Sequence, residues 1–207
     1  AQPRRARGDQ VSASFVHRLA LVETDSIGEG TRVWAFAHVM AGAKVGRDCN
    51  IGEHCFIETG ASIGDRATVK NGVLVWDGVE IGDGAFIGPG VVFTNDLRPR
   101  SPRLPEAESR YASRESWLAR TVVATGATIG AGAVILPALT IGAFSMIGAG
   151  AVVTASVPEH GLVVGNPGKA IGWVCRCGER LKVRAGKARC ACRRAYKLSK
   201  GKLSASK

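Results

Sequence analysis

The chain is poor in aromatic residues and has no long apolar run. Phe, Trp and Tyr make up 6% of its 207 residues. No stretch approaches the ~20 apolar residues that a membrane-spanning helix needs. Residues 1–10 contain three arginines and lack the apolar core of a secretory signal peptide. We therefore expect a cytoplasmic protein with no membrane partner, built from one main domain and a small appendage.

Basic residues are concentrated at the C-terminal end. Residues 20–168 contain 11 Lys or Arg and 15 Asp or Glu, a net charge of −4, whereas residues 169–207 contain 13 and 1, a net charge of +12. A basic segment of this kind can bind nucleic acid or another acidic surface. A solvated tail that aids solubility is the simpler interpretation, so we do not expect nucleic acid as a partner.

An aliphatic residue or Phe recurs every six residues along most of the chain. Gly follows many of these positions, and a small residue usually stands two places before them, as Ala37, Cys49 and Cys55 do. These positions, termed rungs, are Phe15, Leu21, Ile27, Val33, Val39, Val45, Ile51, Ile57, Ile63, Val69, Val75, Ile81, Ile87, Phe93, Val123, Ile129, Ile135, Ile141, Ile147 and Val153.

A period of six excludes an α-helix, whose apolar stripe recurs every three to four residues. It predicts an all-β solenoid in which each hexad is a short strand and a turn, and three hexads form one triangular coil. Successive coils would stack at roughly 4.8 Å, with the rungs in columns inside the prism. Twenty rungs give six to seven coils. We expect the glycine after each rung to relieve a sharp bend, where the backbone can need positive φ.

The ladder of rungs stops at Phe93 and resumes at Val123. Residues 95–120 are rich in Pro, Arg, Ser and Glu, and a loop of this length inside a compact solenoid is usually functional. A helical turn or two fits between Pro105 and Ala119. We expect a disordered N-terminus (1–12), a β-helix domain (13–168, with its loop at 95–120) and a basic C-terminal tail (169–207).

Four of the six cysteines lie in the tail as two C-x-C pairs. Four thiolates can hold one Zn²⁺ tetrahedrally and stabilise a segment too small to have a core of its own. Disulfides are the alternative, which a cytoplasmic chain disfavours. We predict a structural zinc site in a zinc-ribbon-like appendage, formed by Cys175, Cys177, Cys190 and Cys192.

The array resembles that of the hexapeptide-repeat acyltransferases, which form left-handed parallel β-helices. Four segments are further similar to N-acetyltransferases of nucleotide-linked 3-amino sugars: IGEGTRVWAFAHVMAGAKVG, VKNGVLVWDGVEI, IGPGVVFTND and VVGNPGKAIGWV. The resemblance implies a homotrimer that transfers acetyl from acetyl-CoA to the 3-amino group of a dTDP- or UDP-linked sugar in bacterial glycan or deoxysugar biosynthesis.

The resemblance also implies a coenzyme A site where the array ends. The family's apolar pair and G-x-P-A-K turn correspond here to VVGNPGK, with Gly168 in place of Ala. Lys169 would lie near the coenzyme A phosphates, and Gly148, Gly165 and Pro167 would belong to the backbone that binds the cofactor. The alternative is a terminal turn with an exposed lysine.

The acceptor site is implied where the ladder breaks. Asn95 is the leading catalytic candidate, because its amide can position the amine, or the thioester oxygen as it becomes an oxyanion. Asp96 can hold the ammonium and accept its proton, although the departing thiolate can take that proton without a side-chain base. The predicted substrate contacts are Asn71 and Asp77 for the sugar and Arg98 and Arg100 for a pyrophosphate.

Simpler interpretations stay open for these residues. Asn95 and Asp96 can be a turn pair that starts a loop, and the other polar positions can be ordinary corner residues. The four histidines (His17, His38, His54 and His160) are weaker candidates for a base. A non-enzymatic β-helix binding protein with a basic zinc tail, or an acetyltransferase for another small amine, is the alternative function.

Overall fold

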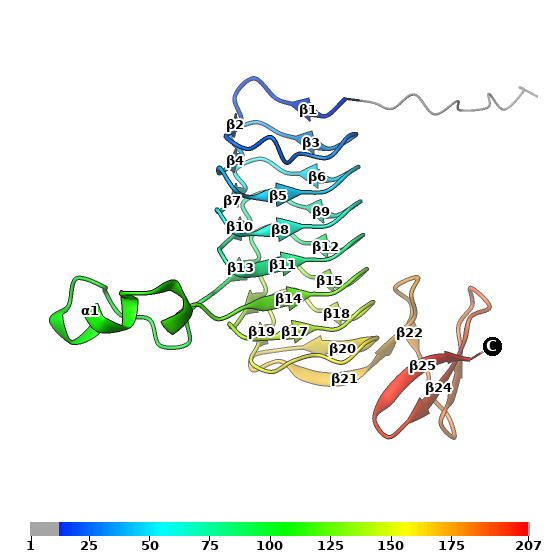
Figure 1. Cartoon of the computed structure of the whole chain (residues 1–207). Coiled ribbons are helices and arrows are strands. Elements are labelled where there is room, and N and C mark those ends of the chain that lie inside the picture. The colour runs from blue at the N-terminus through cyan, green and yellow to red at the C-terminus, as the bar shows by residue number, and fades with distance from the viewer. Residues whose placement is uncertain (1–12, 207) are drawn as a thin grey trace, which may run out of the picture.

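The structure is a computed structural model that describes residues 13–206. Figure 1 shows a three-sided prism of stacked coils, a loop that projects from one edge, and a small module at the C-terminal end. The coils wind in the left-handed sense, and the strands of each face are parallel. The expected disorder of residues 1–12 lies outside the described residues. No helix within residues 13–206 has the length and apolar character to cross a membrane.

Three sheets form the faces of the prism, termed faces A, B and C. Face A contains β1 (Phe15–Val16), β3 (Arg32–Val33), β6 (Asn50–Ile51), β9 (Thr68–Val69), β12 (Phe86–Ile87), β15 (Thr128–Ile129), β18 (Met146–Ile147) and β20 (Gly161–Val164). Face B contains β2 (Leu21–Val22), β4 (His38–Val39), β7 (Phe56–Ile57), β10 (Leu74–Val75), β13 (Val92–Phe93), β16 (Val134–Ile135) and β19 (Val152–Val153). Face C contains β5 (Lys44–Val45), β8 (Ser62–Ile63), β11 (Val79–Ile81), β14 (Thr121–Val123) and β17 (Thr140–Ile141). The chain follows A, B and C in turn, so its corners are A–B, B–C and C–A.

The rung side chains form the core of the prism. Ile57 pairs in register with Val39 in the coil before it and Val75 in the coil after it, and all three are fully buried. The small residues two places before the rungs are buried as well, and burial raises the pKa of the Cys49 and Cys55 thiols. The interior is therefore a set of stacked aliphatic columns, as the six-residue period predicts.

The solenoid is longer than expected. Face A has eight parallel strands, which gives about eight turns instead of six to seven. The additional length comes after Val153, where Val157 pairs with Ile141 and Val163 pairs with Ile147. The columns continue there although the glycine pattern has stopped.

The first two predicted rungs are wrong. Phe15 and Leu21 are 45% and 53% exposed. The residues that align with the later rungs are Val16, which pairs with Val33, and Val22, which pairs with Val39. The hexad before Ile27 is one residue short, so counting back in sixes from Ile27 selects the outward-facing neighbour of each true rung.

The glycine after a rung is required for space and not for positive φ. A Cβ on Gly130 would lie 2.4 Å from the backbone nitrogen of Ala149 in the next coil. Positive φ occurs two residues later, as at Gly132 (φ 64°) and His54 (φ 57°). Our expectation for these glycines was therefore wrong, because the strained bend lies at a different position of each corner.

The loop leaves and re-enters the prism at the B–C corner. It contains α1 (Pro105–Tyr111) and the short 3₁₀ helix η1 (Arg114–Ser116), which confirms the helical turns expected between Pro105 and Ala119. β14 then takes the next place in face C, where Val123 pairs with Ile81 and Ile141. The loop thus replaces a single corner and leaves the stacking intact.

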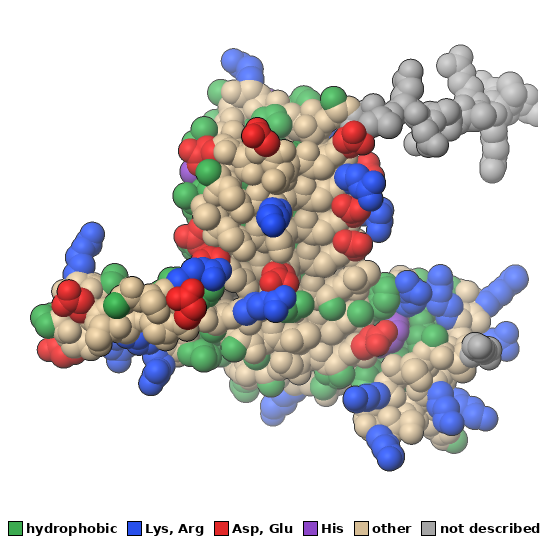
Figure 2. Space-filling view, in the orientation of Figure 1, with side chains coloured by type: hydrophobic (Ala, Val, Ile, Leu, Met, Phe, Trp, Pro, Cys, Tyr) green, Lys and Arg blue, Asp and Glu red, His purple; other side chains and the backbone are tan. Residues whose placement is uncertain are grey.

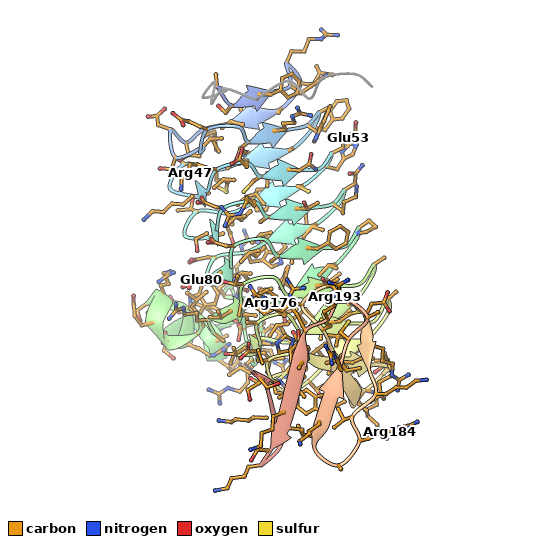
Figure 3. The ribbon with its side chains drawn as sticks, turned by 90° about the vertical axis from the view of Figure 1, so that its right-hand side faces the viewer. Arg47, Glu53, Glu80, Arg176, Arg184 and Arg193 are labelled. Carbon is orange, nitrogen blue, oxygen red and sulfur yellow. The ribbon has the colours of Figure 1, made fainter. Side chains whose placement is uncertain are left out.

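The C-terminal module continues from face A. β20 pairs antiparallel with β21 (Lys169–Val174), which pairs with β22 (Arg180–Leu181). A separate sheet follows, formed by β23 (Lys187–Arg189), β24 (Ala195–Ser199) and β25 (Lys202–Ser206). Figure 2 shows Lys and Arg side chains gathered over this module and Asp and Glu along the edges of the prism, and Figure 3 places Arg184 and Arg193 at different ends of the module.

Candidate functional site

The B–C corner differs from the other two, because none of its rungs is followed by glycine. Consecutive coils instead place Trp76, Thr94, Leu136 and Thr154 there, and these four residues line a cavity of about 630 Å³ at the base of the loop. Our sequence reasoning did not single out Trp76, Leu136 or Thr154. The signal was present, since the glycine is missing after every third rung along the array.

Asn95 lines this cavity and is fixed by both its backbone and its side chain. Its Nδ2 donates to the Asp77 carbonyl oxygen one coil away at 3.2 Å, and its own carbonyl oxygen accepts from the Ala119 N–H at 2.8 Å. These bonds fix the side chain and leave Asn95 Oδ1, together with the second N–H of Nδ2, available to a ligand.

Asp96 also lines the cavity, but its carboxylate is occupied by the loop. It accepts from the Arg110 guanidinium, from the Tyr111 hydroxyl at 2.6 Å and from the Arg98 backbone N–H at 2.8 Å. The hydrogen bonds from Arg110 are the largest cause that lowers the pKa of Asp96 to about 2. A carboxylate held in this way is suited to anchoring the loop and poorly suited to accepting a proton near neutral pH.

Asp77 makes the second anchor of the loop. Its two carboxylate oxygens accept from Arg114 Nε at 2.5 Å and Arg114 Nη2 at 2.6 Å, a bidentate pair. Its backbone N–H donates to Glu58. Asp77 and Asp96 thus lie one coil apart on the same corner, and each binds a different arginine of the loop.

The other predicted substrate contacts are less closely grouped. Arg98 and Arg100 are exposed on the loop beside the cavity residues Leu97 and Pro99. Asn71 is exposed on the A–B corner, which borders the opposite side of face B. Within one chain the structure therefore brings Asp77, Asn95 and Asp96 together and leaves Asn71 apart.

The predicted coenzyme A residues meet at the end of the solenoid. Gly148 donates its N–H to Val163 at 2.8 Å in β20, and Gly165 and Pro167 form the turn between β20 and β21, with the Asn166–Pro167 peptide bond cis. Lys169 begins β21 and is exposed. These four residues thus lie at or next to one hairpin.

The four tail cysteines form a compact cluster. Their Sγ atoms all lie within 4.8 Å of one another, with 3.4 Å between Cys175 and Cys192 and 3.5 Å between Cys177 and Cys190. A tetrahedral Zn²⁺ with Zn–S bonds of about 2.3 Å needs sulfur separations of roughly 3.8 Å. The cluster fits a structural zinc site with no open position.

The two C-x-C pairs are equivalent turns. Cys175 N–H donates to Glu179 O and Gly178 N–H to Cys175 O, and the same bonds join Cys190 to Arg194 and Arg193. The backbone N–H two residues after each cysteine donates to its sulfur. This geometry explains how the tight C-x-C spacing presents both sulfurs to one ion, which the sequence left unexplained.

None of the histidines belongs to the set of residues that lines the cavity, within the described chain. His38 lies on face B and contacts Glu23 at 3.0 Å, His54 stacks on Phe36, and His160 is buried under the C-terminal module. The cavity thus offers amide, hydroxyl and aromatic groups, and its one carboxylate is paired with arginine. Such a site positions reactants and has no free side-chain base of its own.

Comparison with known proteins agrees with this architecture. The family model described as bacterial transferase hexapeptide (six repeats) matches residues 26–59 and 60–95. The dTDP-3-amino-3,6-dideoxy-alpha-D-galactopyranose 3-N-acetyltransferase of Aneurinibacillus thermoaerophilus is 50% identical over 190 residues, which cover 92% of this chain and 94% of that protein. The chain belongs to the hexapeptide-repeat sugar N-acetyltransferases. The expected family is confirmed.

A solved structure supports the same fold. A mutant of AntD, an N-acyltransferase from Bacillus cereus in complex with dTDP and coenzyme A, has a TM-score of 0.50 at 17% identity, covering 81% of this chain and 86% of that chain. PerB from Caulobacter crescentus, solved with CoA and GDP-perosamine, has a TM-score of 0.46 at 24% identity. The match to PerB covers 78% of this chain and spans 58% of that protein.

Proposed function

We propose that this member of the family is an N-acetyltransferase that moves acetyl from acetyl-CoA to the 3-amino group of a dTDP-linked deoxysugar. The observation that carries this proposal is the 50% identity to the dTDP-amino-sugar enzyme along 92% of the chain. The cavity at the B–C corner, with the fixed amide of Asn95, supplies the corresponding acceptor site.

In the proposed reaction, the neutral amine attacks the thioester carbonyl carbon, a C–N bond forms, and the C–S bond breaks. Asn95 Oδ1 accepts one N–H of the amine and directs the nitrogen lone pair, while the bond from Asn95 Nδ2 to Asp77 O holds the amide in place. The amine proton leaves with the thiolate, giving coenzyme A thiol. This route needs no base from the chain, which suits a cavity whose carboxylate, Asp96, has a pKa of about 2.

The charged residues of the loop have separate roles in this proposal. Arg98 and Arg100 are exposed beside the cavity, where a pyrophosphate can pair with guanidinium groups. Asp77 contacts the sugar while it stays paired with Arg114, and Asp96 holds the loop over the site. Gly148, Gly165, Pro167 and Lys169 bind acetyl-CoA at the β20–β21 hairpin.

The proposal includes a homotrimer built on face B. The outward residues of this face are Leu21, His38, Phe56, Leu74, Val92, Val134 and Val152, of which only the histidine is polar. Leu74 and Val92 are 39% and 47% exposed, so face B presents an apolar surface that a single chain leaves uncovered. If face B of each subunit packs around a threefold axis, the A–B corner of one subunit meets the B–C corner of the next. Asn71 then reaches the cavity of a neighbouring subunit.

A structural Zn²⁺ and a cytoplasmic location complete the proposal, with no membrane or nucleic-acid partner. The free thiols of Cys49 and Cys55 and the thiolate cluster in the tail fit a reducing compartment.

The deciding experiment measures thiol release from acetyl-CoA with a panel of amines. We expect dTDP-3-amino-3,6-dideoxygalactose to have the highest kcat/KM, above its UDP-linked and 4-amino counterparts and above serine. Mass spectrometry of the product should show one added acetyl group on the 3-amino nitrogen. If no nucleotide amino sugar gives thiol release above background, the proposed function is wrong.

A further inference from the structure

One strand joins the candidate coenzyme A turn to the candidate metal centre. β21 begins at Lys169 and ends at Val174, and Cys175 follows directly. Six extended residues span about 20 Å. The strand pairs antiparallel with β20 along its length, with a register shift between Leu162 and Val163, and its last two residues also pair with β22. A displacement of Cys175 is therefore transmitted along a paired strand to the turn.

Stacked aromatic rings form a second connection. Tyr196 is 1% exposed, and its hydroxyl contacts Cys175 Sγ at 3.1 Å and accepts from the Arg176 N–H at 3.1 Å. The Tyr196 ring meets His160 edge-on at 5.0 Å, and His160 stacks on Phe144 at 5.6 Å. The Arg176 guanidinium lies 4.1 Å from the Phe144 ring centre, which closes the chain of contacts. Figure 3 shows Arg176 where the module meets the β-helix.

His160 links these rings to the other strand of the hairpin. It immediately precedes β20, and its carbonyl oxygen accepts from the Val174 N–H at 2.8 Å. Its own backbone N–H donates to the carbonyl oxygen of Ala143, which lies on the same corner one coil earlier. Both strands that carry the turn at 165–168 are thus fastened, at the end away from the turn, to groups that contact the cysteine cluster.

The module depends on its ligands for a core. Its buried cluster consists of Cys175, Leu181, Ala188, Cys190, Tyr196 and Leu203, so two of the six core residues are themselves candidate metal ligands. A segment this short rarely folds on aliphatic burial alone, and metal binding supplies the missing stability. Loss of the ion removes the constraint on Cys175 and Tyr196 together.

We propose that metal binding at the four cysteines is coupled to coenzyme A binding at the β20–β21 turn, with Tyr196 and His160 as positioning residues. The metal fixes the module, the module fixes the far ends of both strands, and the turn presents its backbone and Lys169 in a set geometry. The coupling rests on the proposed function, because it requires that this hairpin binds coenzyme A.

The primary test measures the Kd of coenzyme A by calorimetry in the full-length protein, zinc-loaded and zinc-depleted. We expect zinc removal to raise this Kd by at least about fivefold, the lower range of allosteric coupling. The Kd of dTDP should stay unchanged, because none of the residues that line the cavity beside Asn95 belongs to the module. An unchanged coenzyme A Kd after zinc removal overturns the coupling alone. No coenzyme A binding by the zinc-loaded protein removes the proposed function and the coupling with it.

Variants at the aromatic connection test the route. His160→Ala removes the central ring, whereas His160→Phe keeps an aromatic ring there. The Phe variant loses the two ring nitrogens, and one of them, Nδ1, has no hydrogen-bond partner in the structure. We expect the Ala variant to raise KM for acetyl-CoA without changing kcat and the Phe variant to restore it, both with one zinc per chain. Tyr196→Phe, which loses the contacts with Cys175 and Arg176, should resemble His160→Ala. Equal KM values in all three variants and the wild type would exclude this route.

Hydrogen exchange supplies a readout independent of activity. In zinc-depleted protein the amides of Gly168 and Val174, which donate to Val152 O and His160 O, should exchange faster. The Gly88 amide, bonded to Ile129 O within the prism, is the internal control. Cys49→Ala, a core cysteine outside the cluster, should leave zinc content and exchange at both hairpin amides unchanged. Linkage also requires that coenzyme A raise the affinity of the protein for zinc, so that a competing chelator removes less zinc at equilibrium, and an unchanged zinc affinity contradicts the coupling.

Discussion

Single residues in this solenoid are constrained mainly by the backbone of the next coil. The glycine after a rung faces backbone atoms one coil away, while the residue two places later faces solvent and carries the positive φ. Two glycines of one corner can therefore be required for different reasons. Gly130 is required for space, whereas Gly132 avoids the strain of a φ of 64°, a conformation that His54 adopts at the equivalent position.

Substitution of these two glycines should separate the two effects. In Gly130→Ala the new Cβ would lie 2.4 Å from the Ala149 nitrogen, so the coils must move apart. We expect a loss of about 3 kcal/mol or more in the free energy of unfolding, at the upper end for overpacking. Gly132→Ala has no atom near its Cβ and should cost only about 1–2 kcal/mol for the left-handed conformation. Urea denaturation measures both, and equal losses would contradict the distinction.

Replacement of Asn95 tests its position in the proposed reaction. Asn95→Ala removes the amide that faces the substrate amine, so turnover should fall at least about tenfold, or about 1.4 kcal/mol in activation free energy. The oligomer should persist. Thr59→Ala is the matched control, because Thr59 holds the same corner position two coils away and does not line the cavity. Wild-type kinetics in Asn95→Ala would contradict the role of Asn95 in positioning the substrate amine.

The loop is the element whose conformation is least periodic and most dependent on charge. Its two ends are joined by a bridge between Asp96 and Leu118, its Arg110 binds Asp96 at the start of the loop, and its Arg114 binds Asp77 of the coil. Tyr111 packs against Trp117 inside the loop. The segment is thus an ordered extension that ion pairs hold both within the loop and to the prism.

Acid should release this loop before it unfolds the prism. The pKa of Asp96 is lowered to about 2 in the folded protein, from about 3.9 in an unfolded chain. The ion pair with Arg110 therefore stabilises the loop fully above pH about 4, and this contribution is lost as pH falls through about 2. Carboxyl NMR should give Asp96 a midpoint near 2, and a higher one in Arg110→Ala. Arg103→Ala, which removes an exposed arginine of the same loop, should leave the midpoint in place.

Sequence periodicity predicted the prism well because each rung contacts residues one coil away, so the spacing alone defines the neighbours. It failed where the six-residue spacing continues but the side chains at that spacing point outward. One missing residue before Ile27 turned Phe15 and Leu21 outward without breaking the count of six. The loop contacts were beyond this reasoning, since the pairing of Asp77 with Arg114 joins residues in an irregular segment that no period relates.

The candidate site was predicted in the same partial way. A break in the ladder pointed to the region of Asn95, and the structure has a cavity there because the insertion disturbs one corner. The sequence offered Asp96 as a base, whereas its pKa depends on Arg110, a residue on α1 whose direction only the folded loop defines. The cysteines were found by residue type, and their C-x-C spacing made sense only with the turn geometry in view.

At the scale of the whole molecule, face B is the surface that one chain leaves uncovered. Leu74→Arg places a charge in its centre, and a buried unpaired charge strongly opposes association. We expect light scattering to give a trimer for the wild type and a monomer for this variant. Ser62→Arg, at an outward position of face C, should remain trimeric. A wild-type mass for Leu74→Arg would rule out face B as the interface.

The placement of Asn71 and Asn95 on opposite corners of face B has a genetic consequence. If each active site takes Asn95 from one subunit and Asn71 from its neighbour, two inactive alleles can complement each other. In trimers reassembled from equal amounts of Asn71→Ala and Asn95→Ala chains, three quarters are mixed, and each mixed trimer contains one wild-type site. About a quarter of full activity should return, whereas sites confined to single chains would return none.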